Sequence, residues 1–376
     1  MKEAGLYIHI PFCEKKCDYC DFYSITKLDQ MDKFVQALRK EIEIRAQDFS
    51  GYVFQTIYFG GGTPSLLNEN QMRHIWDSLT ENFIFNNNSE ISIEANPGTL
   101  TQTKLSFLKE IGFNRLSLGV QSFNPSELKF LGRINSLEEV YHTFDYARNA
   151  GFNNINLDLM TAFPGITINS FKHSITEAQK LKPEHISCYT LIFEPGTVFY
   201  KKMLHGDLIP LEDDEEASYY QIARQKLQKN GYLNYEISNF SAGEKNMCKH
   251  NQIYWKHKPY LGLGPSAHSF SQNQRQANKR SISNYISQLN KGILPVDFQE
   301  SLSDEDKMFE YIFLNLRLQD GINFSEFQTL FGQDYGERFK SKIKYLSENN
   351  LIELTTDSLK LSDRGWMLAD SVATYF

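Results

Sequence analysis

The sequence predicts an α/β fold, an incomplete (β/α)6 barrel, followed by a mostly helical, winged-helix-like C-terminal domain. In the first 200 residues, six short apolar runs alternate with five longer stretches whose apolar residues recur at helical spacing. Strict alternation of strand and helix indicates a parallel sheet, open or closed into part of a barrel. Beyond residue 302 most of the apolar spacing is helical.

The expected elements follow one another in order along the chain. Strands are expected at 6–10, 56–59, 90–95, 115–120, 154–159 and 185–192. Helices are expected at 31–46, 71–83, 101–111, 137–150 and 168–181. Gly112 and Gly151 directly follow two of these helices, and glycine is common where a helix ends.

Polar residues occupy one face of the third, fourth and fifth expected strands. Apolar and polar side chains alternate there, and Glu94, Gln121 and Asp158 lie on the polar face near the strand ends. A parallel strand packed on both faces is normally a continuous apolar run. The alternation therefore predicts a barrel interior that holds a polar ligand. An antiparallel sheet with one wet face is the alternative, but the intervening helices fit it poorly.

The remaining chain has a less regular pattern. A helix is expected at 213–230, and its acidic first turn is favoured by the helix dipole. Segment 235–270 is expected to be rich in loops, because Tyr, Trp, His and Gly are dense there. In the segment from 303 onward, helices are expected from 303, at 324–331 and at 335–349. A hairpin (351–355 and 358–361) and a last helix from Asp363 are expected to follow.

Three units are expected from this pattern. They are the barrel at 1–200, a region at 201–300 that completes the barrel, and the winged-helix-like domain at 301–376. The expected helix at 335–349 mixes lysine and arginine with glutamate, so it favours a packing role over DNA binding.

Composition excludes several classes of protein. Lysine and arginine number 39 against 46 aspartate and glutamate, and the net charge of −7 argues against a nucleic-acid partner. No window approaches the ~20 apolar residues that span a bilayer, and we expect no signal peptide. Three of the five cysteines fall within eight positions, which indicates a metal and a reducing compartment, the cytoplasm.

Cys13, Cys17 and Cys20 form a C-x3-C-x2-C run directly after the first expected strand. Three thiolates on a short loop suit a [4Fe–4S] cluster, with one thiolate on each of three irons and the fourth iron open. A structural zinc site needs a fourth protein ligand, and His9 in the preceding strand is poorly placed to supply it. Disulfide pairing would leave one cysteine over. The run therefore favours the cluster, with zinc as the lesser alternative.

The cysteine spacing resembles that of the radical S-adenosylmethionine (SAM) superfamily. The resemblance implies that SAM binds the open iron, that the reduced cluster can cleave SAM to a 5′-deoxyadenosyl radical, and that the fold is a radical-SAM partial barrel. Further segments resemble the family of oxygen-independent coproporphyrinogen III oxidases and their relatives, the HemW haem chaperones. These segments are YIHIPFC at 7–13, FGGGTP at 59–64, IEANP at 93–97, GVQSF at 119–123, GR at 132–133, NLD at 156–158 and EPGT at 194–197.

Carried over residue by residue, the resemblance implies cofactor contacts. It implies that Cys13, Cys17 and Cys20 are the cluster ligands. It implies that eight further residues contact SAM: Tyr7, Gly61, Gly62, Thr63, Glu94, Gln121, Arg133 and Asp158.

Two functions are compatible with the resemblance, and three features favour the haem carrier over the oxidase. Phe22 stands where the oxidases carry a further cysteine, and only twelve residues precede Cys13. The run HNxxYW beginning at His250 matches a pattern associated with haem binding in the chaperones. An imidazole is a ready axial ligand, although a histidine among aromatic residues is often simply packed. We therefore expect haem contact near His250 and no coproporphyrinogen III dehydrogenase activity. Whether His250 ligates the haem iron is left open.

The carrier interpretation also implies partners. They are haem, a haem-accepting protein such as a membrane-bound respiratory enzyme, and an electron donor for the cluster. The sequence leaves open whether the chain forms a homodimer and whether SAM is cleaved or only bound.

Overall fold

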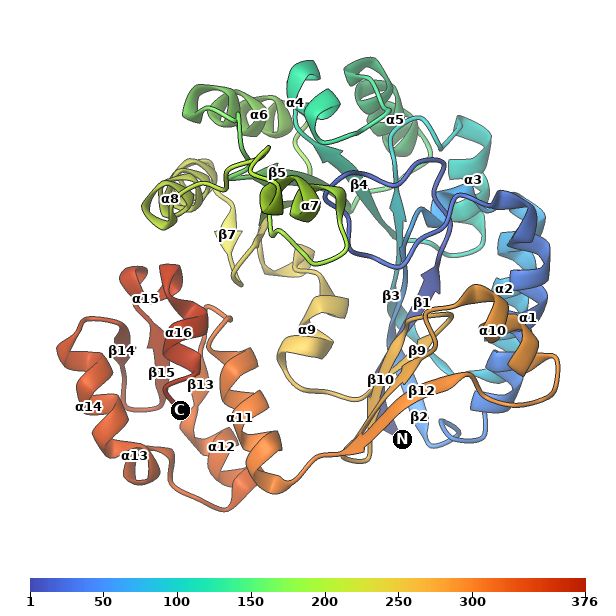
Figure 1. Cartoon of the computed structure of the whole chain (residues 1–376). Helices are drawn as coiled ribbons and strands as arrows, with labels where there is room; N and C mark the ends of the chain where they lie inside the picture. Colours follow the sequence, from blue (N-terminus) through green and yellow to red (C-terminus); the bar gives the residue numbers. More distant parts are fainter.

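The computed structural model describes residues 1–376, and its N-terminal half is a parallel sheet with strands in chain order (Figure 1). Each of the first six strands pairs in parallel with the next. This confirms the incomplete (β/α)6 barrel. The strands are β1 (Lys2–Ile10), β2 (Tyr52–Gly61), β3 (Phe85–Ala95), β4 (Arg115–Gln121), β5 (Ile155–Thr161) and β6 (His185–Thr190).

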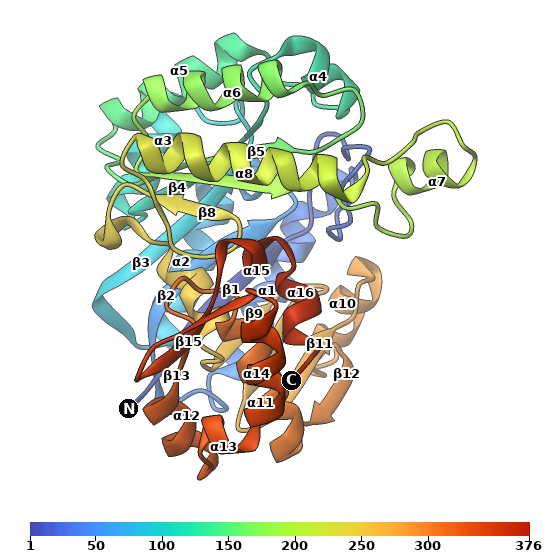
Figure 2. The ribbon, with the colours of Figure 1, turned by 90° about the vertical axis from the view of Figure 1, so that its left-hand side faces the viewer.

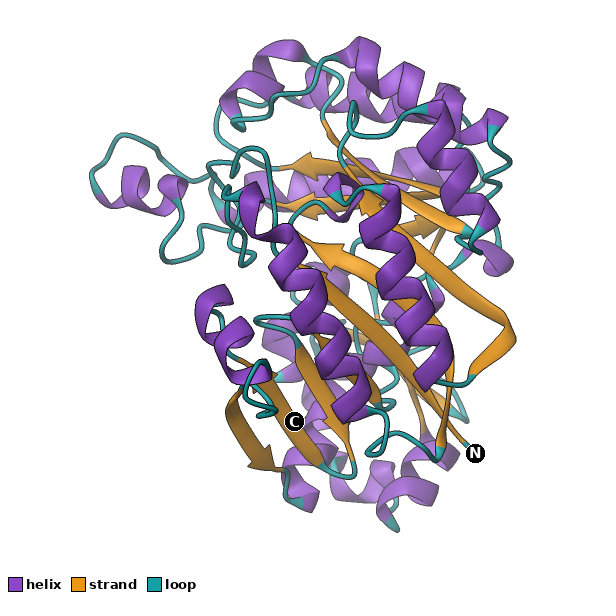
Figure 3. Ribbon diagram, turned by 90° about the vertical axis from the view of Figure 1, so that its right-hand side faces the viewer, coloured by secondary structure: helices purple, strands orange, loops and turns teal.

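Helices cover the outer face of this sheet, as Figure 3 shows. Two of them begin with a capping box, in which Asn68 with Gln71 and Ser136 with Glu139 satisfy the first free N–H groups of the helix. The apolar faces of the helices and strands together form one core of 61 buried residues. The helices are α1 (Met31–Arg45), α2 (Glu69–Asn82), α3 (Gln102–Glu110), α4 (Pro125–Phe130), α5 (Leu137–Asn149), α6 (Ile168–Lys180) and α8 (Asp213–Lys229).

The acidic start of α8 is confirmed, since all four residues of its first turn are acidic. Short α7 (Val198–Leu204) lies in an arm that stands out from the body at the right of Figure 2. Neither α4 nor α7 was expected from the sequence, because six or seven residues give too few turns for a helical period to be recognised.

The sheet continues beyond the barrel strands on both sides, to twelve strands in all. The prediction of a loop-rich stretch at 235–270 was therefore incomplete: it holds α9 (Lys249–Trp255) and three of the added strands in whole or part. The added strands are two to six residues long, and two of them pair with barrel strands far away along the chain, which a local pattern does not report. They are β7 (Leu233–Asn234), β8 (Asn239–Ser241), β9 (Tyr260–Leu263), β10 (His268–Ser271), β11 (Gln274–Asn278) and β12 (Val296–Ser301), with α10 (Ile282–Leu289) between the last two.

The C-terminal residues form a second body with its own core of 17 buried residues, below the barrel in Figure 2. A three-stranded antiparallel sheet packs there with helices, as expected for a winged-helix-like domain. The expected helix at 335–349 is divided at Phe339, whose φ of −110° interrupts it. The elements are α11 (Asp304–Asn315), β13 (Ile322–Asn323), α12 (Phe324–Phe331), α13 (Tyr335–Arg338), α14 (Lys340–Glu348), β14 (Ile352–Leu354), β15 (Ser358–Leu361), α15 (Asp363–Met367) and α16 (Ala369–Ala373).

The two bodies are joined by a backbone bridge between Glu236 and Leu318 and by an ion pair of 3.0 Å between Arg224 and Asp363. No helix in the structure is both long enough and apolar enough to cross a membrane.

Candidate functional site

The three clustered cysteines lie on one closed loop at the carboxyl end of β1. The loop is closed by two backbone bonds, from Cys13 N to the Ile25 carbonyl (3.0 Å) and from Ile25 N to the Pro11 carbonyl (2.8 Å). A turn then brings Cys20 N within 3.2 Å of the Cys17 carbonyl. Barrel enzymes build their active sites at the carboxyl ends of the strands. The thiols lie at this end of the sheet.

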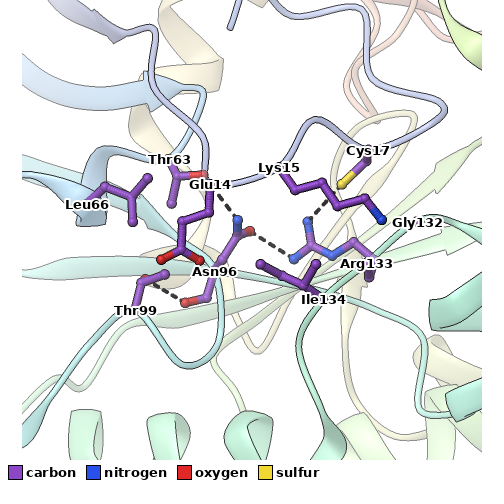
Figure 4. Close-up of a pocket in the computed structure, with 10 residues that line it drawn as sticks. All are labelled: Glu14, Lys15, Cys17, Thr63, Leu66, Asn96, Thr99, Gly132, Arg133 and Ile134. Carbon is purple, nitrogen blue, oxygen red and sulfur yellow. Dashed lines mark hydrogen bonds between the residues drawn. The ribbon is translucent and has the colours of Figure 1, made fainter. Parts of the chain in front are cut away.

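Two of the thiols receive hydrogen bonds from residues of other elements, and Figure 4 shows the bond to Cys17. The hydroxyl of Thr63 donates to Cys13 Sγ over 3.5 Å, and Arg133 Nη1 donates to Cys17 Sγ over 3.6 Å. Donors and a positive charge at sulfur stabilise the thiolate, which is the form that binds iron. This donor set fits a sulfur-ligated iron cluster.

Burial opposes the charged form of two thiols of the loop, those of Cys13 and Cys20. It raises the pKa of Cys13, and it raises that of Cys20 to about 11. No three His, Cys, Asp or Glu side chains lie close enough to hold one metal ion between them. A [4Fe–4S] cube distributes its thiolates over separate irons, so its ligands need not converge on a single point.

The glycine run after β2 forms one wall of the barrel interior. Gly61 has φ +107°, and its N–H donates to Glu94 Oε2 over 3.1 Å. A Cβ at this position would lie 2.5 Å from the His9 ring, so only glycine fits. The space that a side chain would need at Gly61 and Gly62 is filled by His9 and by the backbone of Phe12, so close packing requires these glycines. Their contact with SAM stays a prediction.

Two half-buried carboxyl groups face the same interior. Tyr58 donates its hydroxyl to Glu94 Oε1 over 2.9 Å, and Ser117 donates to Asp158 Oδ2 over 3.0 Å. Burial first, and then the nearby charge of Asp158, raise the pKa of Glu94 to about 7. Burial also raises the pKa of Asp158. A cationic ligand between these two groups would relieve their repulsion.

Gln121 and Arg133 complete the rim on the β4 side. The pairing of β4 with β5 shifts register between Gly119 and Gln121, and Gln121 has φ +71°. A β-bulge of this kind re-aims a side chain, and the Gln121 amide and the Arg133 guanidinium both lie over Gly119. A guanidinium in this position suits a carboxylate such as that of SAM.

Tyr7 connects the interior to the cysteine loop. Its hydroxyl donates to His9 Nδ1 over 3.1 Å, and His9 Nε2 donates to the Tyr23 carbonyl over 2.8 Å. Burial lowers the pKa of His9 to about 4, so the ring is neutral near pH 7 and is free to accept from Tyr7. The structure therefore brings all eight expected SAM residues and the three cysteines to one end of the barrel.

His250 lies elsewhere, buried in the layer below this rim. Its Nδ1 is 2.8 Å from the Thr56 hydroxyl and its Nε2 is 2.8 Å from the Tyr254 hydroxyl. The ring stacks on Tyr58, with centroids 4.9 Å apart, and on Tyr7, with centroids 6.3 Å apart. Its side chain is thus a packed histidine without a free nitrogen, the interpretation that sequence reasoning kept as the alternative to iron ligation. Haem contact at His250 stays a prediction.

Glu90 fixes the start of the helix that carries His250. One carboxylate oxygen accepts from Lys249 N over 3.2 Å and the other from His250 N over 3.1 Å. A carboxylate at a helix N-terminus satisfies free N–H groups and suits the helix dipole. The α9 helix, which packs against β1 and β2, is therefore held at its first turn as well as along its side.

Sequence reasoning missed two residues of the site, Tyr58 and Asn96. Tyr58 shares a strand face with Gly60 at i+2, so its inward direction was available from the strand period. Asn96 shares the polar face of Glu94, but nothing in the sequence shows which residues its amide contacts. Its contacts with Thr63 and Arg133 appear only in the folded chain.

A partial (β/α)6 barrel with three cysteines on the loop after its first strand defines a radical SAM protein. The model of the Radical SAM superfamily matches residues 7–178, and that of the HemN C-terminal domain matches residues 302–368.

Known proteins narrow this class to a family. The chain is 37% identical to the heme chaperone HemW of Bacillus subtilis (strain 168), over 99% of this chain and 98% of that protein. It is 32% identical to HemW of Lactococcus lactis subsp. lactis (strain IL1403), over 100% and 97%. Among solved structures it resembles coproporphyrinogen III oxidase (HemN) from Escherichia coli, with a TM-score of 0.88 and 25% identity over 100% of this chain and 90% of that one. The chain belongs to the HemW haem chaperone family.

Proposed function

We propose that this protein binds haem and delivers it to haem-dependent proteins, with a [4Fe–4S] cluster on the cysteine loop and SAM in the barrel interior. The observation that carries the proposal is the similarity to haem chaperones along 99% of the chain. The proposed partners are haem, an acceptor such as a membrane-bound respiratory enzyme, and an electron donor for the cluster.

The residues at the rim have distinct tasks in this proposal. Cys13, Cys17 and Cys20 hold the cluster, which when bound supplies an electron to SAM or fixes its position. Arg133 neutralises negative charge beside Cys17 and binds a carboxylate. The Glu94 carboxyl, held by Tyr58 and the Gly61 N–H, accepts hydrogen bonds from the ammonium or ribose of the ligand.

Haem is the cargo, and the HNxxYW run is proposed to contact it. In the packed arrangement both nitrogens of His250 are hydrogen-bonded, so iron ligation needs α9 to release the bonds to Thr56 and Tyr254. Two neutral hydrogen bonds are worth on the order of 1 kcal/mol each, which an iron–imidazole bond can offset. Haem titration of His250→Ala beside wild type tests this step, and equal affinity for haem would remove His250 from the haem site.

Coproporphyrinogen III oxidation is the second candidate, favoured by the shared fold with the Escherichia coli oxidase. The deciding experiment is anaerobic. The cluster is reconstituted, SAM and a reductant are added, and haem binding is measured beside vinyl-group formation from coproporphyrinogen III. Tight haem binding without decarboxylation supports the carrier, whereas turnover of coproporphyrinogen III would overturn it.

A further inference from the structure

Asn96, the residue directly after β3, joins the two hydrogen-bond donors that reach the cysteine loop. Its Oδ1 accepts from Arg133 Nη2 over 2.8 Å, and its Nδ2 donates to Thr63 Oγ1 over 3.1 Å. These are the same Arg133 and Thr63 that donate to Cys17 and Cys13. Figure 4 shows the amide lying between them.

The guanidinium of Arg133 decides which group donates and which accepts in each hydrogen bond of this series. Arginine has only donors, so the amide oxygen of Asn96 must face Arg133 and the amide nitrogen must face Thr63. The Thr63 oxygen is then occupied as an acceptor, and its single proton is free to point at Cys13 Sγ. A carboxylate in place of Asn96 would instead draw that proton away from the sulfur.

Neighbouring residues hold this series of hydrogen bonds in place. Thr63 is 2% exposed, and Arg133 is also fixed on its other edge, where Nε donates to Asn135 Oδ1 over 3.1 Å. Hydrogen bonds that follow one another through shared groups polarise one another. The two sulfur donors are therefore held in position by residues of the chain itself.

We propose that Asn96 is a positioning residue that sets the reduction potential of the cluster, by holding Thr63 and Arg133 on the sulfurs of Cys13 and Cys17. Reduction adds negative charge to the cluster, and hydrogen bonds and positive charge at the sulfurs favour the reduced form. Loss of the Asn96 amide makes the cluster harder to reduce. This inference rests on the cluster assigned under the proposed function.

The test is a redox titration of the reconstituted full-length protein, followed by the electron paramagnetic resonance signal of the reduced cluster. In Asn96→Ala we expect the equilibrium constant for one-electron reduction to fall roughly tenfold, a shift of about 59 mV to more negative potential. Asn96→Asp keeps the acceptor for Arg133 but redirects the Thr63 proton, so its potential also falls. Thr63→Ser retains the hydroxyl and keeps a potential near that of wild type.

Thr99→Val is the matched control. Thr99 lies in the same pocket and donates its hydroxyl to the Asn96 backbone carbonyl over 2.7 Å, so this variant disturbs Asn96 without touching its amide. We expect an unchanged potential in Thr99→Val. Equal shifts in Thr99→Val and Asn96→Ala would reduce the effect to general disturbance of the loop and overturn the proposal.

The outcomes separate this inference from the proposed function. If the reconstituted wild-type protein held no iron and sulfide, the assignment of the cluster itself would be wrong. A full cluster in wild type, with the wild-type potential retained in both Asn96 variants, would overturn only the role of Asn96. If Asn96→Ala assembles no cluster, Asn96→Asp, which conserves size and shape, decides the question in the same titration.

Discussion

Two layers of the barrel interior are built from the same kinds of side chain but are satisfied in different ways. The rim layer comprises Thr63, Glu94, Asn96 and Arg133, and the lower layer comprises Thr56, His185 and His250. In the rim layer, donors end on sulfur atoms and on a carboxyl that burial keeps partly neutral. In the lower layer, both ring nitrogens of each histidine are hydrogen-bonded, those of His185 to Asn156 and Tyr235.

The two layers also differ in their response to pH. Burial lowers the pKa of His250 to about 3 and that of His185 well below its usual value, so the lower layer is uncharged throughout the physiological range. Burial raises the pKa of Glu94 to about 7, so the rim changes charge within that range. The difference teaches that polar residues alone do not mark a ligand site. Those of the lower layer are paired with one another, whereas those of the rim end on the cysteine sulfurs and on a carboxyl that titrates.

The largest expected effect is the loss of the cluster when a thiol of the cysteine loop is removed. Replacing Cys13, Cys17 or Cys20 by serine leaves one iron without its thiolate, and we expect each variant to lose most of its iron and sulfide. Metal and sulfide analysis after anaerobic reconstitution is the measurement. Cys188→Ser is the control, because Cys188 is a buried core residue. Full iron and sulfide in all three loop variants would refute the cluster.

A substitution in the lower layer is expected to lower the stability of the protein without loss of the cluster. His250→Ala leaves the hydroxyls of Thr56 and Tyr254 without their partner and opens a cavity behind Tyr58. We expect the free energy of unfolding to fall by about 3 kcal/mol, measured by urea denaturation, while cluster content is retained. Unchanged stability would mean that the ring is not bound as the structure has it.

Most of the barrel could be predicted from the sequence, because its strands and helices are long and periodic. The lower layer could not. Thr56 and His250 are 194 positions apart, and nothing in the HNxxYW run shows that both nitrogens of its histidine are already paired. The amide of Asn96 was equally hidden, since its role depends on Arg133, which follows 37 positions later.

The rim predicts a dependence of SAM binding on pH. The ionised Glu94 carboxylate attracts the cationic ligand, and with a pKa of about 7 this carboxylate is protonated as the pH falls. We expect SAM affinity to drop about tenfold from pH 8 to pH 6, which corresponds to about 1.4 kcal/mol. Isothermal titration calorimetry at several pH values measures it. Glu94→Gln should bind weakly with a flat profile, and a profile that stays steep in Glu94→Gln would assign the titration to another group.

The smallest effect is expected at the contact between the layers. Tyr58 stacks on His250 below and donates its hydroxyl to Glu94 above. That bond lowers the pKa of Glu94, so its removal in Tyr58→Phe should raise this pKa further and move the midpoint of the SAM profile to higher pH. The phenylalanine keeps the stacked ring, and the lower layer is retained.

Thr56→Val provides the matched change below the contact. It removes one hydrogen bond of His250 and should lower the free energy of unfolding by about 1 kcal/mol, with the SAM midpoint unchanged. The same calorimetric profile and a urea denaturation curve, recorded for both variants, give the comparison. If Thr56→Val moved the midpoint as far as Tyr58→Phe, the two layers would act as one network, and haem bound at His250 would then alter SAM affinity by the same factor as SAM alters that of haem.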